Sequence, residues 1–180
     1  MSAEIFVETK RLILGEIIPE DANKLFNLDS DPLVHRFLRN KPLKSREEAV
    51  ERIELIRAQY EENGIGRWAV IEKETAEFTE WSGLKLEPIE TNGFKNYIDL
   101  GFRFIPKYWG RGYASESELA SVVYGFEKLG YESIYGAADA DNIGSNKALQ
   151  KSGFKFINDF EYDRAPHKWY ALTRDQYLVG

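Results

Sequence analysis

The feature that most constrains this chain is the segment Lys107-Tyr108-Trp109-Gly110-Arg111-Gly112-Tyr113-Ala114-Ser115, which lies between a strand-like run and a helix-like run. Its two glycines allow a tight turn and a close approach to a ligand, because no Cβ intervenes. Where such a turn opens a helix, unpaired N–H groups and the positive end of the helix dipole face one point. We interpret the segment as an anion site suited to a pyrophosphate; the alternative is a plain strand-to-helix connection.

Two common glycine motifs do not fit this turn. A dinucleotide-binding fingerprint needs G-x-G-x-x-G, and Ser115 occupies the third glycine position. A Walker loop needs Gly-Lys followed by Ser or Thr, and the turn lacks that triplet. The turn alone is therefore a weak indication of which phosphate compound binds.

Length and composition predict one compact domain over residues 1–180, with 43% hydrophobic and 30% charged residues. The absence of cysteine excludes disulfides and thiolate catalysis. The net charge of −6 argues against a nucleic-acid partner and is compatible with a cationic substrate such as an amine. No apolar run reaches the ~20 residues that span a membrane, and Met1 to Lys10 lacks the apolar centre of a secretory signal. We expect a cytoplasmic protein with no membrane partner.

Hydrophobic periodicity predicts an α/β (α+β) chain whose mixed sheet has helices packed on it. Ser45 and Glu48 have the spacing of a capping box, and Asn63-Gly64 is a helix stop. Asn92-Gly93 is a strong hairpin signal. The expected strands span 11–14, 68–71, 81–86, 97–105, 134–138, 154–157 and 168–172. The expected helices begin at 19, at 45, at the glycine turn and at about 145, and end near 31, 63, 129 and 152.

A second segment, Asn142-Ile143-Gly144-Ser145-Asn146-Lys147-Ala148-Leu149-Gln150-Lys151-Ser152-Gly153-Phe154, changes the interpretation of the turn. Together, the two segments resemble the acyl-CoA-binding core of the GNAT-type N-acetyltransferases, with Trp109 where the family motif has Arg or Gln. Glu8 to Leu14 is similar to the opening strand of the Rim-type branch, which acts on ribosomal-protein N-termini among other amines. The resemblance covers roughly residues 8 to 172.

The resemblance implies a single-domain, mostly antiparallel mixed sheet with splayed central strands and flanking helices. It implies acetyl-CoA as co-substrate and no metal. Phe102-Arg103-Phe104 would offer the strand edge that binds the pantetheine arm, and Asn142 would hydrogen-bond that arm. The cofactor-binding residues that it predicts are Phe102, Arg103, Phe104, Trp109, Gly110, Arg111, Gly112, Tyr113, Ala114, Ser115, Asn142, Asn146 and Lys151.

For the catalytic residues, the resemblance places Ser145 near the thioester sulfur. Many family members have a tyrosine acid four residues later, where this chain has Leu149, so Ser145 becomes the predicted partner of the leaving thiolate. Its alternative role is a helix N-cap. Glu161 is the predicted base, with Asp159, Asp99 and Glu87 as further carboxylates; for each of them, a solvated surface group is the more common role. For His35 and His167, we expect surface or packing roles.

These observations predict an enzyme that moves an acetyl group from acetyl-CoA directly to a primary amine in a ternary complex. The alternative is a non-catalytic acyl-CoA sensor, because the turn motif serves both. A protein N-terminus, a polyamine, an aminoglycoside-like drug or an amino acid would each fit as acceptor. The sequence permits a homodimer without requiring one.

Overall fold

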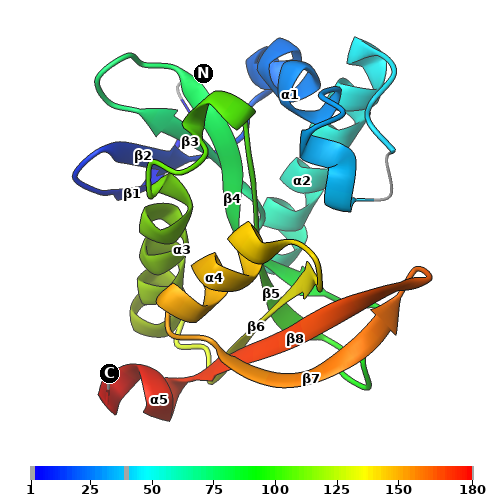
Figure 1. The fold of residues 1–180 in the computed structure, drawn as a ribbon. Coiled ribbons are helices and arrows are strands. Elements are labelled where there is room, and N and C mark those ends of the chain that lie inside the picture. The colour runs from blue at the N-terminus through cyan, green and yellow to red at the C-terminus, as the bar shows by residue number, and fades with distance from the viewer. Residues whose placement is uncertain (1–2, 39–40, 180) are drawn as a thin grey trace.

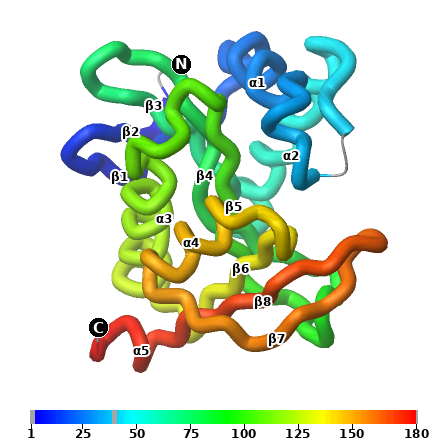
Figure 2. The backbone as a smooth tube through the Cα atoms, in the orientation of Figure 1, coloured from blue at the N-terminus to red at the C-terminus, as the bar shows by residue number. Residues whose placement is uncertain are grey.

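An eight-stranded sheet organises the computed structural model, which describes residues 3–38 and 41–179 (Figure 1). The strand order is β1-β2-β3-β4-β5-β6-β8-β7, and only β5 and β6 pair in parallel. Figure 2 shows β1, β2 and β3 at one end of the sheet and the β7–β8 hairpin at the other. The strands are β1 (Ile5–Glu8), β2 (Leu12–Gly15), β3 (Trp68–Glu72), β4 (Phe78–Glu87), β5 (Tyr97–Phe104), β6 (Ser133–Asp139), β7 (Lys155–Tyr162) and β8 (Ala165–Thr173). The predicted mixed, mostly antiparallel sheet is confirmed.

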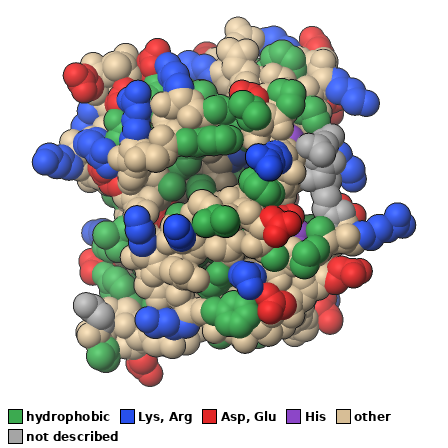
Figure 3. All heavy atoms as spheres, viewed as in Figure 1, with side chains coloured by type: hydrophobic (Ala, Val, Ile, Leu, Met, Phe, Trp, Pro, Cys, Tyr) green, Lys and Arg blue, Asp and Glu red, His purple; other side chains and the backbone are tan. Residues whose placement is uncertain are grey.

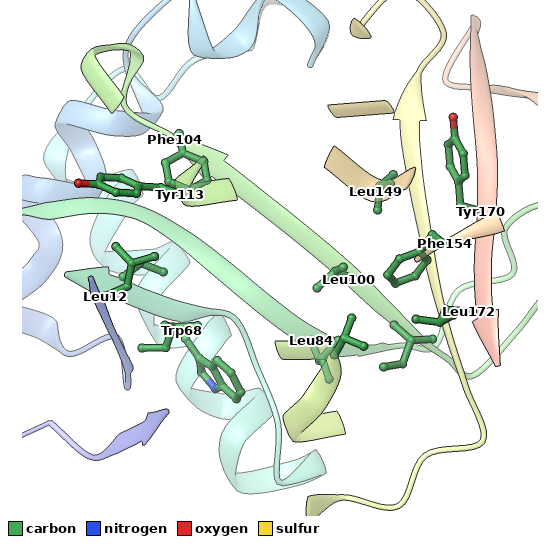
Figure 4. Close-up of a cluster of buried hydrophobic side chains, with 14 of the residues drawn as sticks. Leu12, Trp68, Leu84, Leu100, Phe104, Tyr113, Leu149, Phe154, Tyr170 and Leu172 are labelled. Carbon is green, nitrogen blue, oxygen red and sulfur yellow. The ribbon is translucent and has the colours of Figure 1, made fainter. Parts of the chain in front are cut away.

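Helices cover both faces of this sheet, because alternate residues of a strand point to opposite sides. Trp68 and Val70 of β3 pack into a core with α3 and α4, whereas Ala69 packs into a second core with α1 and α2. Figure 4 shows the first core continuing from Leu12 and Trp68 to Tyr170 and Leu172. The helices are α1 (Ala22–Asp29), α2 (Arg46–Asn63), α3 (Tyr113–Val123), α4 (Ile143–Lys151) and α5 (Arg174–Val179).

Several predicted boundary signals are confirmed. The Ser45 side chain accepts a hydrogen bond from the Glu48 backbone N–H and so caps α2, which ends at left-handed Gly64. Asn92 and Gly93 both have positive φ angles, 51° and 79°, in a tight turn between β4 and β5. The local sequence alone determines these features, since each rests on one or two residues with special backbone chemistry.

Some elements differ from the prediction. Strand β1 and helix α5 were not expected, because both are short and largely exposed and so lack a periodic apolar pattern. Strand β4 begins at Phe78 rather than 81, beyond a register shift against β3. The hairpin strands are longer than predicted, since β7 continues to Tyr162 and β8 begins at Ala165.

Helix α3 and its continuation bury polar as well as apolar side chains. Val122 and Phe126 are fully buried in the core and Leu119 is 52% exposed, yet Glu118 is also fully buried. The Ser152 hydroxyl donates to Glu118 Oε2 at 2.7 Å, so this buried carboxyl has a polar partner. A π-helical segment, Tyr124–Lys128, continues α3 to the stop at Gly130.

The centre of the sheet is split between β5 and β6. These strands share one bridge, Asp99 with Tyr135, and then diverge. On their outer sides, β5 stays paired with β4 up to Phe104, and β6 stays paired with β8 up to Asp139. The predicted splaying is therefore confirmed, and it leaves one edge of β5 open from about residue 100 onward.

The main-chain groups on that open edge follow from strand alternation. The Ile105 N–H donates to Thr79 O on the β4 side at 3.0 Å. Because neighbouring residues of a strand direct their N–H and C=O groups to opposite sides, those of Phe104 and Phe102 face the gap. A free strand edge of this kind pairs readily with an extended chain of amides.

Candidate active site

A cavity of about 740 Å³ opens where β5 and β6 diverge. In Figure 3, this face is hollowed between an upper part built on α1, α2 and the start of α3, and a lower part built on α4 and the β7–β8 hairpin. The cavity brings together most of the residues that the sequence predicted for the site. These are Phe102, Arg103, Phe104, Trp109, Gly110, Gly112, Tyr113, Ala114, Asn142 and Ser145.

One wall of the cavity is the glycine turn. Gly110 and Gly112 have φ angles of 73° and 78°, in the left-handed region that favours glycine. Gly112 is the N-cap of α3, so the first N–H groups of that helix, from Tyr113 to Ser115, have no acceptor within the helix itself. These donors and the positive end of the helix dipole face this wall, an arrangement that favours an anion. We call the turn with the open edge of β5 and the start of α4 the turn side.

The turn is held from outside by the loop between β1 and β2. The Arg11 guanidinium donates to Arg111 O at 2.9 Å and to Glu116 Oε2 at 2.6 Å. Glu116 Oε1 also accepts from the Thr9 hydroxyl at 2.6 Å and from the Arg11 backbone N–H at 3.0 Å. The conformation of the turn is therefore fixed without a ligand.

Two aromatic side chains brace the turn from inside. The Tyr113 ring is buried and its hydroxyl donates to Glu72 on β3, so only the main chain of Tyr113 is available to a ligand. Trp109, which replaces the polar residue of the family motif, donates from Nε1 to Phe104 O at 3.1 Å. That bond ties the turn to the end of β5.

Within the turn side, the start of α4 lies across the cavity from the glycine turn. Asn142 is its N-cap, and Asn142 Oδ1 accepts from the Ser145 backbone N–H at 3.1 Å. The alternative role of Ser145 as a helix cap is therefore wrong, because Asn142 fills that role. Ser145 lies in the first turn of α4 and lines the cavity, as does the buried side chain of Leu149.

Five predicted site residues do not line the cavity. Asn146 is buried, donating to Asp139 O and Asn142 O and accepting from the Tyr170 hydroxyl, so its amide holds α4 to the sheet. Exposure places three others on the surface: Arg111 outside the turn, Lys151 at the far end of α4 and Glu161 on edge strand β7. Ser115 contributes at most its backbone N–H. Helix phase and strand alternation, which motif spacing does not reveal, decide these placements.

The other wall of the cavity is lined by charged residues that the sequence motifs did not connect; we call it the arginine side. Arg67 is buried, donates to Asp99 O at 2.8 Å, and also bonds the Asp99 carboxylate and Gly83 O. A side chain at Gly101 would collide with the Arg67 guanidinium, 2.6 Å from the position of its Cβ. Asp99 is thus an ion-pair partner rather than the surface carboxylate or base that the sequence left open.

Arg103 projects away from the open edge toward α1. Its guanidinium lies 4.7 Å from the centre of the Trp81 ring, and Nη1 donates to Asp29 Oδ1 at 2.7 Å. The Arg52 guanidinium bonds the other oxygen of Asp29, which is fully buried, at 2.8 Å. His35 Nε2 lies 4.0 Å from Asp29 Oδ1, and burial, followed by the charge of Arg103, lowers the pKa of His35.

His167 lines both this wall and a smaller adjoining hollow. Its Nδ1 lies 3.1 Å from Ala165 O, a contact that suits an Nδ1–H donor and leaves Nε2 as the acceptor. His167 lies opposite Asp139, at the open end of β6. The predicted β8 began only at Lys168, so the sequence alone did not place His167 on a strand beside this gap.

Two carboxyl groups are buried beneath α3, next to the turn side. Burial raises the pKa of Glu118 to about 8 and raises the pKa of Glu80 well above its ordinary value. Both groups are completely buried, and serine hydroxyls of Ser117 and Ser152 lie around them. At neutral pH, both carboxyls therefore favour the protonated form.

Within residues 3–38 and 41–179, no helix is long and apolar enough to cross a bilayer. The same residues contain no group of three His, Asp or Glu side chains that could hold a metal ion.

Comparison with known proteins identifies the family. Residues 11–155 match the model of the acetyltransferase (GNAT) domain. The uncharacterized N-acetyltransferase YoaA of Bacillus subtilis is 33% identical over 155 residues, covering 83% of this chain and 82% of YoaA. The chain therefore belongs to the GNAT acetyltransferase family.

Solved structures share the fold. The ribosomal-protein-S5-alanine acetyltransferase from Vibrio fischeri has a TM-score of 0.75 and 16% identity, over 97% of this chain and 98% of that one. The spermidine N-acetyltransferase from Vibrio cholerae, in complex with CoA and spermine, has a TM-score of 0.75 and 18% identity, over 94% and 99% of the two chains. These likenesses concern the fold.

Proposed function

We propose that this chain transfers an acetyl group from acetyl-CoA directly to a primary amine. The observation that carries the proposal is that three donor sets open on one cavity: the glycine turn, the free edge of β5 and the capped start of α4. Coenzyme A has three matching parts, namely a pyrophosphate, an arm with two amides and a thioester.

Each part of the co-substrate has a proposed partner. The N–H groups at the start of α3 bind the pyrophosphate. The main chain of Phe102 and Phe104 pairs with the arm as an added strand does. Asn142 uses Oδ1 for its cap, so its Nδ2 is the group that remains for the arm.

The chemistry requires a neutral amine, a stabilised oxyanion and a leaving thiolate that is stabilised by a hydrogen bond. The amine nitrogen forms a bond to the thioester carbon, and an N–H on the open edge near Phe104 stabilises the oxygen as it becomes negative. His167 Nε2 accepts the proton that the amine loses. When the carbon–sulfur bond breaks, Ser145 donates a hydrogen bond to the thiolate. Leu149 cannot do so, because it carries no polar atom.

Release of free CoA on mixing with acetyl-CoA and a panel of primary amines tests the proposal. An enzyme releases CoA in an amine-dependent way and forms the matching acetamide, measured by mass spectrometry. Tight binding of acetyl-CoA with no amide formed from any acceptor would instead establish a non-catalytic sensor.

Ser145→Ala tests the role of the hydroxyl. Because the hydrogen bond strengthens as the thiolate forms, we expect kcat to fall by at least ~10-fold with little change in KM for acetyl-CoA. The melting temperature should stay the same, since Asn142 caps α4. An unchanged kcat would refute the role of Ser145 and leave the transferase assignment standing.

A further inference from the structure

The arginine side of the cavity continues into a second, smaller hollow of about 240 Å³. Arg103 and His167 line both spaces, so the two adjoin. The hollow is also lined by Lys41, Arg52 and His35, and no carboxylate is among its lining residues in the described part of the chain. In a chain whose net charge is −6, this local concentration of cations is unexpected. We call this hollow the arginine pocket.

The charges around the arginine pocket do not balance. Asp29 lies behind it and bonds two guanidinium groups, those of Arg103 at 2.7 Å and Arg52 at 2.8 Å. Because the single carboxylate of Asp29 balances only one of the two guanidinium groups, one positive charge remains. Lys41 adds a second positive charge. Within residues 3–38 and 41–179, Lys41 has no ion-pair partner at 4.0 Å or less. An excess charge near low-dielectric walls favours a bound counter-ion.

The arginine pocket also holds unpaired hydrogen-bonding groups. His35 is 3% exposed, yet neither of its ring nitrogens has a hydrogen bond of normal geometry to the described residues. Arg103 Nε is buried and unpaired by the same measure. A buried polar group with no hydrogen-bond partner is costly, so these groups indicate a partner outside the described chain.

The position of the pocket suits one part of the acceptor. Arg103 directly precedes Phe104, whose main chain faces the gap that we propose for the thioester arm. The guanidinium of Arg103 points from that strand into the pocket, across the Trp81 ring. A molecule with its amine at the thioester therefore has room to extend a second group to the arginine pocket.

Resting on the proposed transferase function, we propose that the arginine pocket binds a carboxylate of the acceptor, so that the substrate class is primary amines that carry a carboxylate. The planar fork of Arg103, with Lys41 beside it, matches a carboxylate in charge and geometry. An amino acid and a peptide with an acidic residue next to its N-terminus both carry this chemistry. A polyamine carries the opposite charge and is disfavoured.

Matched acceptor pairs test the proposal. γ-Aminobutyrate is compared with its amide, and the peptide Ala-Asp-amide with Ala-Asn-amide, by CoA release with saturating acetyl-CoA. We expect the carboxylate member of at least one pair to have a kcat/KM at least ~10-fold higher, mostly through KM, as charged hydrogen bonds of this kind predict. The preferred pair identifies the source, small amine or peptide. Equal rates within both pairs, or a preference for spermidine, would overturn the proposal.

Two charge reversals on one loop provide the matched control. Lys41 lines the arginine pocket, and Lys44 is equally exposed but lines neither space. Lys41→Glu should lower the ratio of kcat/KM for the carboxylate acceptor to kcat/KM for its amide by at least ~10-fold, since repulsion replaces attraction. Lys44→Glu should leave that ratio unchanged. Identical behaviour of the two variants would contradict a specific anion site.

A binding measurement separates this proposal from the proposed function. N-Acetyl-γ-aminobutyrate and its amide are titrated calorimetrically into the chain with CoA present, which requires no turnover. Carboxylate-dependent binding that Lys41→Glu abolishes would support the pocket even if no acetyl transfer were seen. Acetyl transfer without any preference for the carboxylate, in rate or in binding, would refute the pocket and leave the transferase intact.

Discussion

The two sides of the cavity are built from different chemical groups. The turn side consists of main-chain groups within short stretches, residues 110–115 and 142–145, where glycine and a helix cap set the geometry. The arginine side consists of charged side chains from separate elements, with Asp29, Arg52 and Arg103 as its centre. The first can be recognised from local sequence, whereas the second exists only once the fold has brought its parts together.

A buried carboxyl group lies behind each side of the cavity, and the two groups have opposite kinds of partner. Glu118, beneath the turn side, has one serine hydroxyl as partner and a pKa raised by burial to about 8. Asp29, behind the arginine side, bonds two guanidinium groups as a carboxylate. Replacement of the acid by its amide should therefore raise the free energy of unfolding at Glu118 and lower it at Asp29.

Glu118→Gln is expected to give the largest change in the free energy of unfolding. The folded chain keeps a proton that the unfolded chain releases above the ordinary pKa of 4.5, so this contribution to stability is present below pH 4.5 and is lost as the pH rises toward 8. The loss is about 1.4 kcal/mol per pH unit in that window. Urea unfolding from pH 4.5 to 8 should show Glu118→Gln more stable than the native chain at pH 8 and equal at pH 4.5.

Exposed Glu132→Gln is the control and should leave the pH profile unchanged. A loss of stability at pH 8 in Glu118→Gln would contradict the buried, protonated carboxyl.

Asp29→Asn should shift stability the other way. An amide cannot balance two guanidinium groups, and removing one partner of a buried ion pair costs about 3–5 kcal/mol. Urea unfolding at pH 7 measures the change, with Glu118→Gln as the matched acid-to-amide comparison. Equal stability of Asp29→Asn and the native chain would show that the arginine side does not depend on this charge.

Gly112→Val tests the turn side. Valine must adopt a φ near 78°, and its side chain projects where the pyrophosphate would approach, while the nearest described neighbour of the new Cβ, Arg11 Nη2, is 3.6 Å away. We expect the Kd for CoA, measured by titration calorimetry, to rise on the order of 100-fold.

Gly93→Val is the matched control for backbone strain, since Gly93 has a φ of 79° and open space around its Cβ position in a remote turn. If Gly93→Val weakened CoA binding as much as Gly112→Val does, the effect would belong to the fold rather than to the site.

Asn142→Ser should give the smallest effect and separate two roles of one side chain. Serine caps helices as well as asparagine does, so the melting temperature should hold. Losing the amide that we assign to the pantetheine arm should raise KM for acetyl-CoA about fivefold, equivalent to about 1 kcal/mol. A drop in melting temperature with KM unchanged would show that Asn142 acts only as a cap.

The backbone geometry of the turn side could be predicted from the sequence because its signals are local. The positive φ of Gly112 and the cap at Ser45 are properties of single residues in short contexts. The N-x-x-S segment was expected to offer Ser145 as the cap of α4, whereas the structure assigns the cap to Asn142. Spacing alone could not decide this, because Asn and Ser cap helices equally well.

The arginine side escaped prediction for a physical reason. Asp29 and Arg103 are 74 positions apart, and nothing in either neighbourhood identifies the other as its partner. Net charge did not reveal this side either, because the chain carries −6 overall, whereas the local charge around Arg103 is positive. Glu161 does not line the cavity, because β7 extends past the predicted end and carries it along the edge of the sheet.

The bonds from Thr9 and Arg11 to Glu116 also constrain the order in which the molecule assembles. These partners are 107 and 105 positions apart, so the first strand pair leaves the ribosome long before the residue that completes its contacts. Contacts of such sequence separation form late, since a long loop must close first. The glycine turn should therefore be among the last parts of the chain to become rigid, and a nascent chain that ends before Glu116 should have no affinity for CoA.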